Sequence, residues 1–528
     1  MSLKSKSIYL TPILLTIVLF FTGYNKGLDI FINPVANIDG ACKGDVLCQI
    51  EKASKTIVVL VYDDVSITLR VAKHFLAYGN TNFNTTDSAQ AATSYLLPIV
   101  ASPLFLLPDS IAVLIFSFFG FLSVYMSWYI LVKGQNDENK ILLILVVFVN
   151  TTISTYMLSG WENVHQGLLV LLSWYVVINR KGSLSYILIG LLSSIAILTR
   201  IDSVFIIFSI YLFFLYQKDF KAFFISSAAG LVVGFIYFYF QLSWFEYITP
   251  TTARLKTGFS IDVVYNAKYL LEMLVSGSCL LYIIYFIYEL FRKGTLRDET
   301  KFIIIGSFIT LIYAAYVSDY FSFGRMYIAV FILLTYTFCT LEKLKLNKYI
   351  IYIISALSLF YVSFDNFKYE LVYSNSNSGA NSAEGQQYIL ATELPKYIKP
   401  EDGAIGLFWL GATSFALPNY EIADFLGKAD ESIAQLDAIK GLPIGHNKFN
   451  SVISLDKWNV AVVPMRISQA MLSIDEDLII IEKKESYYWS EFKLELIDRG
   501  YTFCRPVNNI SWGVYVRKDL LSRFENCD

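Results

Sequence analysis

A series of long apolar runs in the first 365 residues is the feature that most constrains the fold. A membrane-spanning helix needs about 20 predominantly apolar residues, and a somewhat shorter run suffices inside a bundle. Hydrophobic residues make up 55% of the 528-residue chain and charged residues only 16%. We therefore predict a polytopic α-helical membrane protein with about 11 transmembrane helices, at residues 8–24, 110–132, 141–158, 162–179, 184–200, 203–216, 220–241, 266–291, 301–317, 324–341 and 347–364.

One further apolar stretch, residues 91–107, is interrupted by Pro98 and Pro103. It is too short and too broken to span, so we predict an interfacial or re-entrant helix. Lys and Arg residues then gather in the loops on the side of the N-terminus, which is the positive-inside pattern. We therefore expect a cytoplasmic N-terminus in a bacterial inner membrane, with the loop 25–109 and everything after residue 365 outside the cytoplasm.

The last part of the chain, residues 366–528, differs from the rest because its composition is mixed. Short β-rich runs occur at 404–410, 460–463, 478–481 and 512–516, and a helical pattern at 488–500 lies between the last two. We predict a periplasmic α/β domain, called the tail domain below, after a transmembrane domain of residues 1–365. The net charge of −2 offers no basic surface for nucleic acid.

Two adjacent carboxylates, Asp63 and Asp64, form what we call the acid pair. They open an amphipathic run that ends at Gly79, and we expect this helix to lie flat on the bilayer. The simpler interpretation is that Asp64 caps the helix, but a cap explains only one of the two acids. Like charges this close raise one pKa or recruit a cation, so the pair suits a general base for a sugar hydroxyl.

Other polar residues interrupt the apolar runs, and the eleven-span topology puts all of them on the side of the acid pair. They are Glu162, Arg200, Asp202, Thr251, Arg254, Lys256, Asp319 and Arg325. Each one alone is explained as a helix-end anchor that reaches the interface, and for Lys256 we favour that explanation. As a group gathered at one membrane face they indicate a site, in which the cations suit a phosphate.

The six cysteines divide by their surroundings. Cys279 and Cys339 lie inside apolar runs and are expected to be buried thiols. Cys42 with Cys48, and Cys504 with Cys527, are candidate disulfides outside the cytoplasm. Four free thiols are the alternative.

These motifs occur in an order that resembles the GT-C glycosyltransferases, and more narrowly the family of mycobacterial arabinofuranosyltransferases that cap arabinan. The resemblance rests on the acid pair followed by Arg70 and Ala72, on 159–162, on 198–202, on 250–256, on Asp319 with Arg325, and on 422–430 and 444–448. The chain departs from the family pattern at Ile201 and Thr251, where the family has Pro and Asn.

The resemblance implies an enzyme that transfers a sugar, such as a pentofuranose, from a polyprenyl-phosphate donor to a cell-surface glycan or protein. Asp63 or Asp64 would act as the general base, and the other Asp would orient the acceptor or hold a divalent cation. No other cofactor is expected. The phosphate would be held by Arg254, Lys256 and Arg325, and Glu162, Asp202 and Asp319 would bind sugar hydroxyls or pair with Arg200. Arg70, Thr251 and His446 complete the candidate substrate-binding residues, and Asp424 with His446 are more often structural.

Two other classes of function compete with this interpretation. A transporter or flippase for a lipid-linked envelope precursor predicts charges near the membrane midplane and two similar halves, and the sequence has neither. A non-catalytic envelope assembly protein predicts no one-sided cluster of charges. A cytoplasmic location for residue 63 or 450 would exclude the enzyme.

Overall fold

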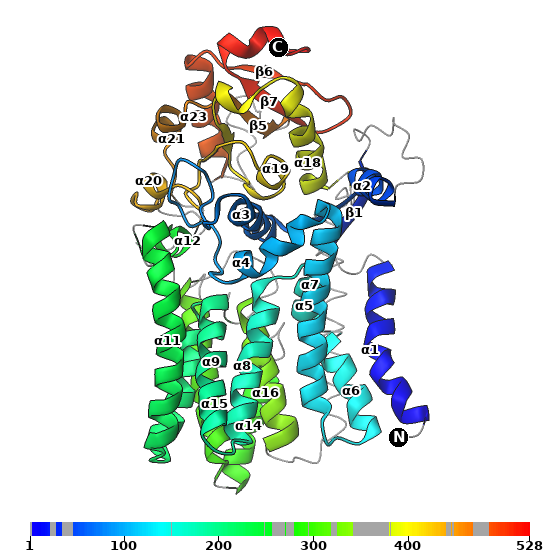
Figure 1. Cartoon of the computed structure of the whole chain (residues 1–528), viewed down its shortest axis with the longest axis vertical. Helices are drawn as coiled ribbons and strands as arrows, with labels where there is room; N and C mark the ends of the chain where they lie inside the picture. The colour runs from blue at the N-terminus through cyan, green and yellow to red at the C-terminus, as the bar shows by residue number, and fades with distance from the viewer. Residues whose placement is uncertain are drawn as a thin grey trace.

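A computed structural model describes residues 3–21, 28–33, 46–148, 150–245, 247, 249–255, 270, 279–293, 295–317, 325–341, 380, 382–439, 445, 448–467 and 485–527. Figure 1 shows a bundle of roughly parallel helices with the tail domain on one end of it. The N-terminus lies at the opposite end of the bundle from the tail domain. Helix α3, which begins with the acid pair, lies between the two parts.

Apart from α14, whose predicted run 266–291 is described only in part, the bundle helices begin and end close to the predicted apolar runs. They are α1 (Leu3–Phe21), α5 (Asp109–Val132), α6 (Asp137–Phe148), α7 (Thr151–Met157), α8 (Glu162–Ile178), α9 (Ser183–Thr199), α10 (Ser203–Tyr216), α11 (Phe220–Trp244), α14 (Cys279–Lys293), α15 (Asp298–Val317) and α16 (Ile328–Tyr336). Among the described helices, α5, α11 and α15 are long and apolar enough to cross a membrane by themselves. The predicted run 347–364 lies outside the described residues.

Two predicted spans are less regular than expected. The run 141–158 is divided between α6 and α7, because Asn150 caps α7 by accepting a hydrogen bond from the Ile153 N–H at 3.2 Å. The run 324–341 starts with a 3₁₀ turn, η2 (Arg325–Tyr327), and ends after α16 in a π-helical turn, η3 (Thr337–Leu341). A capping side chain interrupts the first run, and turns that are not α-helical begin and end the second. Hydropathy alone detects neither feature.

Small residues let the bundle helices approach closely. A Cβ at Gly190 of α9 would collide with the Ser226 carbonyl of α11. One turn on, the Ser194 hydroxyl donates to the Gly230 carbonyl at 2.9 Å. Between apolar helices in lipid there is no hydrophobic driving force, so association depends on close van der Waals contact, which small residues at such crossings allow.

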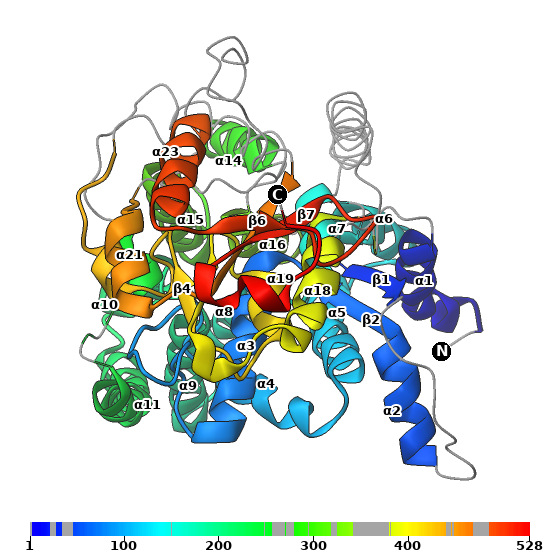
Figure 2. The same cartoon turned by 90° about the horizontal axis from the view of Figure 1, so that it is seen from above.

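A two-stranded ribbon leads into α3 (Asp63–Tyr78). Strands β1 (Leu28–Ile32) and β2 (Ile57–Val61) pair antiparallel, with α2 (Val46–Thr56) between them. Figure 2 shows the ribbon and α2 extending to one side of the tail domain. Because β2 is buried from Val58 to Val61 and only Tyr62 separates it from α3, the position of the acid pair is set by a strand anchored in the core.

Helix α3 is more deeply buried than a helix lying flat on a bilayer. Its polar face carries Ser66, Arg70 and His74, all of which are buried. The physical reason is that the tail domain packs on that face and supplies carbonyl partners to Arg70, whereas Ser66 and His74 contact the carbonyls of Val61 and Asn80. Beside α3, the stretch predicted to be interfacial forms two five-residue helices, α4 (Leu97–Ala101) and η1 (Ser102–Leu106), which are too short to span.

The tail domain is an α/β domain, as predicted. Its five strands lie in the order β4 (Ile422–Asp424), β3 (Ile405–Leu407), β5 (Val462–Arg466), β7 (Trp512–Val516) and β6 (Thr502–Cys504). The first three are parallel, and β7 is antiparallel to both of its neighbours. The prediction missed β4 and β6, which have three residues each, and its run 478–481 lies outside the described residues.

Short helices precede, connect and follow these strands. They are α18 (Ala383–Glu393), η5 (Leu394–Lys396), η6 (Pro400–Asp402), α19 (Gly411–Ala416), α20 (Glu431–Ala434), α21 (Ser451–Trp458), α23 (Glu485–Asp498) and η8 (Lys518–Arg523). Helix α23 corresponds to the helical pattern predicted at 488–500. Helix α12 (Thr251–Leu255) follows α11 and contacts α20.

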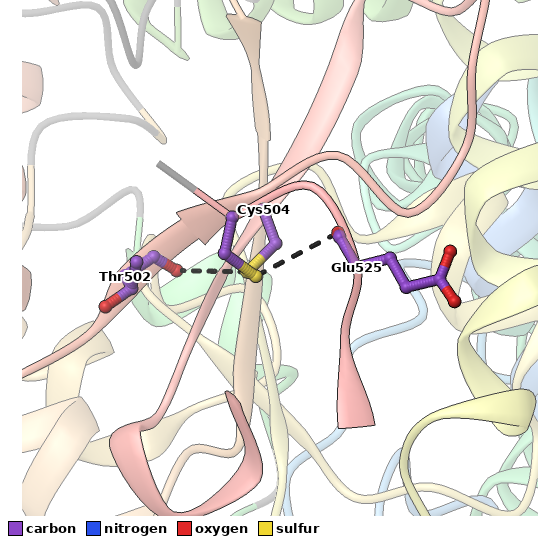
Figure 3. Close-up of a disulfide and its surroundings, with 4 residues drawn as sticks. Thr502, Cys504 and Glu525 are labelled. Atoms are coloured by element: carbon purple, nitrogen blue, oxygen red, sulfur yellow. Dashed lines mark hydrogen bonds between the residues drawn. A yellow bond between two sulfur atoms is a disulfide. The ribbon is translucent and has the colours of Figure 1, made fainter. Parts of the chain in front are cut away.

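A disulfide closes the C-terminal end of the tail domain. Cys504 of β6 is bonded to Cys527 across 23 residues, so this candidate pair is a disulfide and not two free thiols (Figure 3). Cys48 is also disulfide-bonded, whereas Cys42 lies outside the described residues. Cys279 and Cys339 are buried free thiols, as predicted.

We expect the Cys504–Cys527 bond to stabilise the tail domain. In the chain-entropy model, a closed loop of this length contributes about 3 kcal/mol. Replacing both cysteines by serine should therefore make the tail domain unfold at lower urea concentration, measured by pulse proteolysis of the purified protein. The single variant Cys527→Ser should lose as much as the double variant, and equal stability of all three proteins would contradict the prediction.

Candidate active site

The acid pair occupies the first two positions of α3. Tyr62 is the N-cap, and its side chain makes no capping hydrogen bond. The capping explanation for Asp64 is therefore wrong, because the helix begins before it. Both carboxylates lie at the positive end of the helix dipole, which stabilises negative charge.

Asp64 is bound by two cations from different parts of the chain. Its Oδ2 accepts a hydrogen bond from Arg325 Nη1 at 3.0 Å, and its Oδ1 accepts one from Lys428 Nζ at 3.0 Å. Burial raises the pKa of the Asp64 carboxyl, but Lys428 and Arg325 together outweigh that effect and hold the pKa well below its usual range. Asp64 is thus a fixed, ionised carboxylate.

Asp63 has different surroundings. Its Oδ1 accepts a hydrogen bond from the Gly411 N–H at 2.6 Å. Its Oδ2 lies 3.8 Å from Lys428 Nζ and accepts no hydrogen bond within the part of the chain that the structure describes. Burial raises the pKa of Asp63 to about 6, and Lys428 opposes this rise while Asp64 adds to it. Asp63 therefore has one oxygen available and a proton affinity suited to exchange near neutral pH.

Arg325 joins the acid pair to an aromatic cluster. Its guanidinium carbon lies 4.3 Å from the centroid of the Trp161 ring, a cation–π geometry. Tyr62 and Tyr156 pack against the same ring, with centroids 5.8 and 4.9 Å away. The arginine is 5% exposed. Because little water surrounds its charge, the effective dielectric constant is low and its electrostatic interactions are stronger than in water.

Glu162, Arg200 and Asp202 form a second charged cluster. Arg200 donates to both oxygens of Asp202 at 3.0 and 3.2 Å and to Glu162 Oε1 at 2.8 Å. All three side chains are less than a tenth exposed. Arg200 is therefore bound by two carboxylates of its own chain, and of the two roles foreseen for Glu162 and Asp202, pairing with Arg200 is the one this geometry favours.

Thr251 and Arg254 lie together on α12, under the tail domain. Both donate a hydrogen bond to Glu431 of α20. The Arg254 guanidinium also stacks on Tyr247, 3.6 Å from the ring centroid. The Thr251 N–H donates to the Gln90 carbonyl at 3.2 Å. This cluster therefore links the segment between α3 and α4, helix α12 and the tail domain.

Arg70 joins α3 to the tail domain. Its guanidinium donates to the carbonyls of Ser414, Leu417 and Tyr420 at 2.7 to 2.9 Å, and to the Phe83 carbonyl at 3.2 Å. With four of its five N–H groups bound to backbone, Arg70 is suited to a structural role.

Lys256, Asp319 and His446 lie outside the described residues. The structure thus brings the acid pair together with Arg325, Glu162 and Asp202 together with Arg200, and Thr251 together with Arg254.

Lys428 is the site residue that the sequence interpretation missed. It lies in the loop between β4 and α20, within 422–430, one of the blocks on which the resemblance rests. That block was the available signal, but nothing in its spacing relates it to residues 63 and 64.

The residues around the acid pair do not fit a metal ion. Among the residues that the structure describes, no group of three or more His, Cys, Asp or Glu side chains is arranged to hold one. Both oxygens of Asp64 are occupied by cations of the chain. A divalent ion there would meet a lysine and an arginine, so we derive no step through a metal.

Comparison with known proteins supports the fold. No family model and no curated protein matches the sequence. The solved structures that match include the crystal structure of ArnT from Cupriavidus metallidurans in the apo state, with a TM-score of 0.57, 11% sequence identity and coverage of 99% of both chains. ArnT is a GT-C glycosyltransferase. At this identity the likeness concerns the fold, and the chain has a GT-C fold.

The Arg200 cluster should be required for stability. Replacing Arg200 by methionine leaves two buried carboxylates without their cation, which typically costs 3–5 kcal/mol. We expect a large drop in the thermal unfolding midpoint of the detergent-solubilised protein. Arg523→Met is the matched control, because it breaks a pair with Asp402 in which the arginine is 43% exposed, and exposed pairs of this kind contribute little to stability. Equal losses in both variants would contradict the prediction.

Proposed function

We propose that the protein is a membrane glycosyltransferase, which transfers a sugar from a polyprenyl-phosphate donor to a hydroxyl of a cell-envelope acceptor. The observation that carries the proposal is the acid pair, in which one carboxylate is fixed by two cations and the other keeps an available oxygen. It lies between an apolar helical bundle and a folded domain, in a fold shared with a glycosyltransferase. A lipid donor and a polar acceptor would meet at this boundary.

Asp63 is the general base in this proposal. Attack by the acceptor on the anomeric carbon requires its hydroxyl proton to be removed as the new C–O bond forms. Asp63 Oδ2 is available to accept that proton, whereas both oxygens of Asp64 are bound to cations. The N–H of Gly411 fixes the other Asp63 oxygen and thereby orients the carboxylate.

Arg325 is the residue that best suits the leaving phosphate. The phosphate gains negative charge as the sugar–phosphate bond breaks, and a fixed buried cation lowers the barrier to that step. The contact with Asp64 orients the guanidinium before substrate binds. Thr251 and Arg254, on α12 after the end of α11, would also contact the donor in this proposal, at the position where Glu431 accepts their hydrogen bonds.

The resemblance to arabinan-capping enzymes supports a pentofuranose as the sugar and an envelope glycan as the acceptor. We also propose a bacterial inner membrane with the N-terminus in the cytoplasm. Helix α5 starts at Asp109, which pairs with Lys73 of α3, and α8 and α10 start at the Arg200 cluster. Their far ends therefore face away from the tail domain. Basic residues follow those ends: Lys133, Lys140, Arg180, Lys181, Lys218 and Lys221.

Comparison of surface glycans between a deletion strain and its parent tests the function. The mutant should lack one sugar, and membranes holding the protein should restore it to the mutant glycan from a polyprenyl-phosphate-linked pentofuranose. Identical glycans in the two strains would count against the proposal, as would restoration by membranes that lack the protein.

Asparagine at either acid should abolish transfer for different reasons. Asp63→Asn removes the base, whereas Asp64→Asn releases Arg325. In the wild type, transfer requires ionised Asp63. Because burial raises its pKa to about 6, kcat/KM should rise from pH 5 to pH 7 with a midpoint near 6. A flat profile over this range, or full activity of Asp63→Asn, would remove Asp63 from the role of base.

Gly411 should tolerate no side chain. A Cβ there would lie 2.5 Å from both the Cα and the carbonyl oxygen of Asp63, so alanine must displace the base. We expect Gly411→Ala to lower kcat at least tenfold while the protein remains folded, since small misplacements of catalytic groups are costly. Gly234→Ala on α11 is the control, because a Cβ there meets nothing within 4 Å. Equal activity of the two variants would show that Asp63 does not need this position.

A further inference from the structure

The loop that carries Lys428 is a rigid part of the tail domain. Asp424, at the end of β4, accepts hydrogen bonds from the N–H groups of Leu426 and Ala429 at 2.9 and 2.6 Å. Gly427 adopts the left-handed conformation between them, with a φ of 78°. At the other end of the loop, buried Asp430 accepts from the Trp458 indole at 2.6 Å and caps α20.

This rigid loop directs one cation onto the acid pair. Lys428 Nζ lies 3.0 Å from Asp64 Oδ1 and 3.8 Å from Asp63 Oδ2, and its side chain is 13% exposed. The unequal distances make the pair asymmetric, because Asp64 has a direct hydrogen bond and Asp63 has only the field of the charge. Arg325 reaches Asp64 from the bundle side and adds to this asymmetry.

We propose that Lys428 is a positioning residue for transfer: its ammonium fixes Asp64 as an ion and thereby leaves Asp63 as the carboxylate that takes the acceptor proton. This proposal rests on the proposed function. It assigns the tail domain a direct part in the chemistry, because the domain supplies the charge that separates the roles of the two acids. Without that charge, repulsion between the two carboxylates would favour protonation of Asp63, because Arg325 still binds Asp64.

The other charged groups near the acid pair fit this role. Glu384 of α18 acts on Asp63, and Asp424 acts on Lys428, each by electrostatic interaction. Both are acids, so Lys428 and Arg325 are the cations of the described surroundings that oppose the mutual repulsion of the pair. Loss of Lys428 should therefore favour protonation of Asp63.

The test is the pH dependence of Lys428→Met. Losing a cation this close should move the acidic limb of kcat/KM upward by about 1 to 3 pH units, while kcat at high pH recovers and the donor KM stays nearly constant. Lys428→Arg should return the limb close to its wild-type position. Lys396→Met, which breaks a tail-domain pair with Glu393, should leave the limb where it is.

A second readout does not depend on transfer. Dicyclohexylcarbodiimide modifies protonated carboxyl groups in apolar surroundings, and mass spectrometry locates the modified residue. Modification of Asp63 should persist to higher pH in Lys428→Met than in the wild type. The difference in pH should equal the shift of the acidic limb of kcat/KM. If this shift is seen in a protein that transfers no sugar, the positioning role stands and the proposed function fails.

Two results would overturn the proposal. One is an acidic limb and a modification profile that do not move in Lys428→Met. The other is a loss of activity that is equal at every pH and accompanied by a raised donor KM, which would make Lys428 a phosphate ligand. If Lys428→Met does not fold, Lys428→Gln takes its place, and an unshifted limb in folded Lys428→Gln would overturn the proposal as well.

Discussion

The neutralisation of the acid pair is the interaction on which the rest of the architecture depends. Two adjacent carboxylates, each about a fifth exposed, repel each other and lose hydration, so the chain must bring cations to them. One comes from the bundle, at Arg325, and the other from the tail domain, at Lys428. The site therefore exists only when α3, the bundle and the tail domain are docked together.

Several other contacts hold the same three parts in place. Arg70 ties α3 to three carbonyls of the tail domain, and Asn84 exchanges two hydrogen bonds with the backbone of Ile422 at the start of β4. The strand β4 leads directly to the loop of Lys428. Arg70, which a water-facing helix would expose, instead binds carbonyls of the tail domain, and the polar side of α3 is therefore buried.

The helices of the bundle were predicted from the sequence more accurately than the rest of the fold. Long apolar runs and a one-sided distribution of basic residues follow from the cost of placing charge and unpaired backbone in lipid, so helices such as α8, α9 and α10 begin and end within a residue or two of the expected positions. The break at Asn150 was not foreseen, because it depends on one capping hydrogen bond. Strands β4 and β6 were missed because each has three residues and, unlike β3 within the run 404–410, lies in no longer β-rich run.

The site was predicted only in part. Asp63, Asp64 and Arg325 stand out as charges in an apolar chain, and the topology puts them on one side. Arg200 also stands out, but only the structure shows that Glu162 and Asp202 hold it. Lys428 is one ordinary lysine of a mixed-composition domain, 364 residues from Asp64, and no local pattern links the two.

The sequence by itself determined the positions of most of the apolar helices and the different, strand-containing character of the tail domain, because these follow from the transfer of each segment between water and lipid. Only the tertiary structure decided which charges meet and therefore which carboxylate keeps an available oxygen. Two adjacent aspartates are chemically equivalent in the chain, and they differ only because Gly411, Arg325 and Lys428 approach them from different elements.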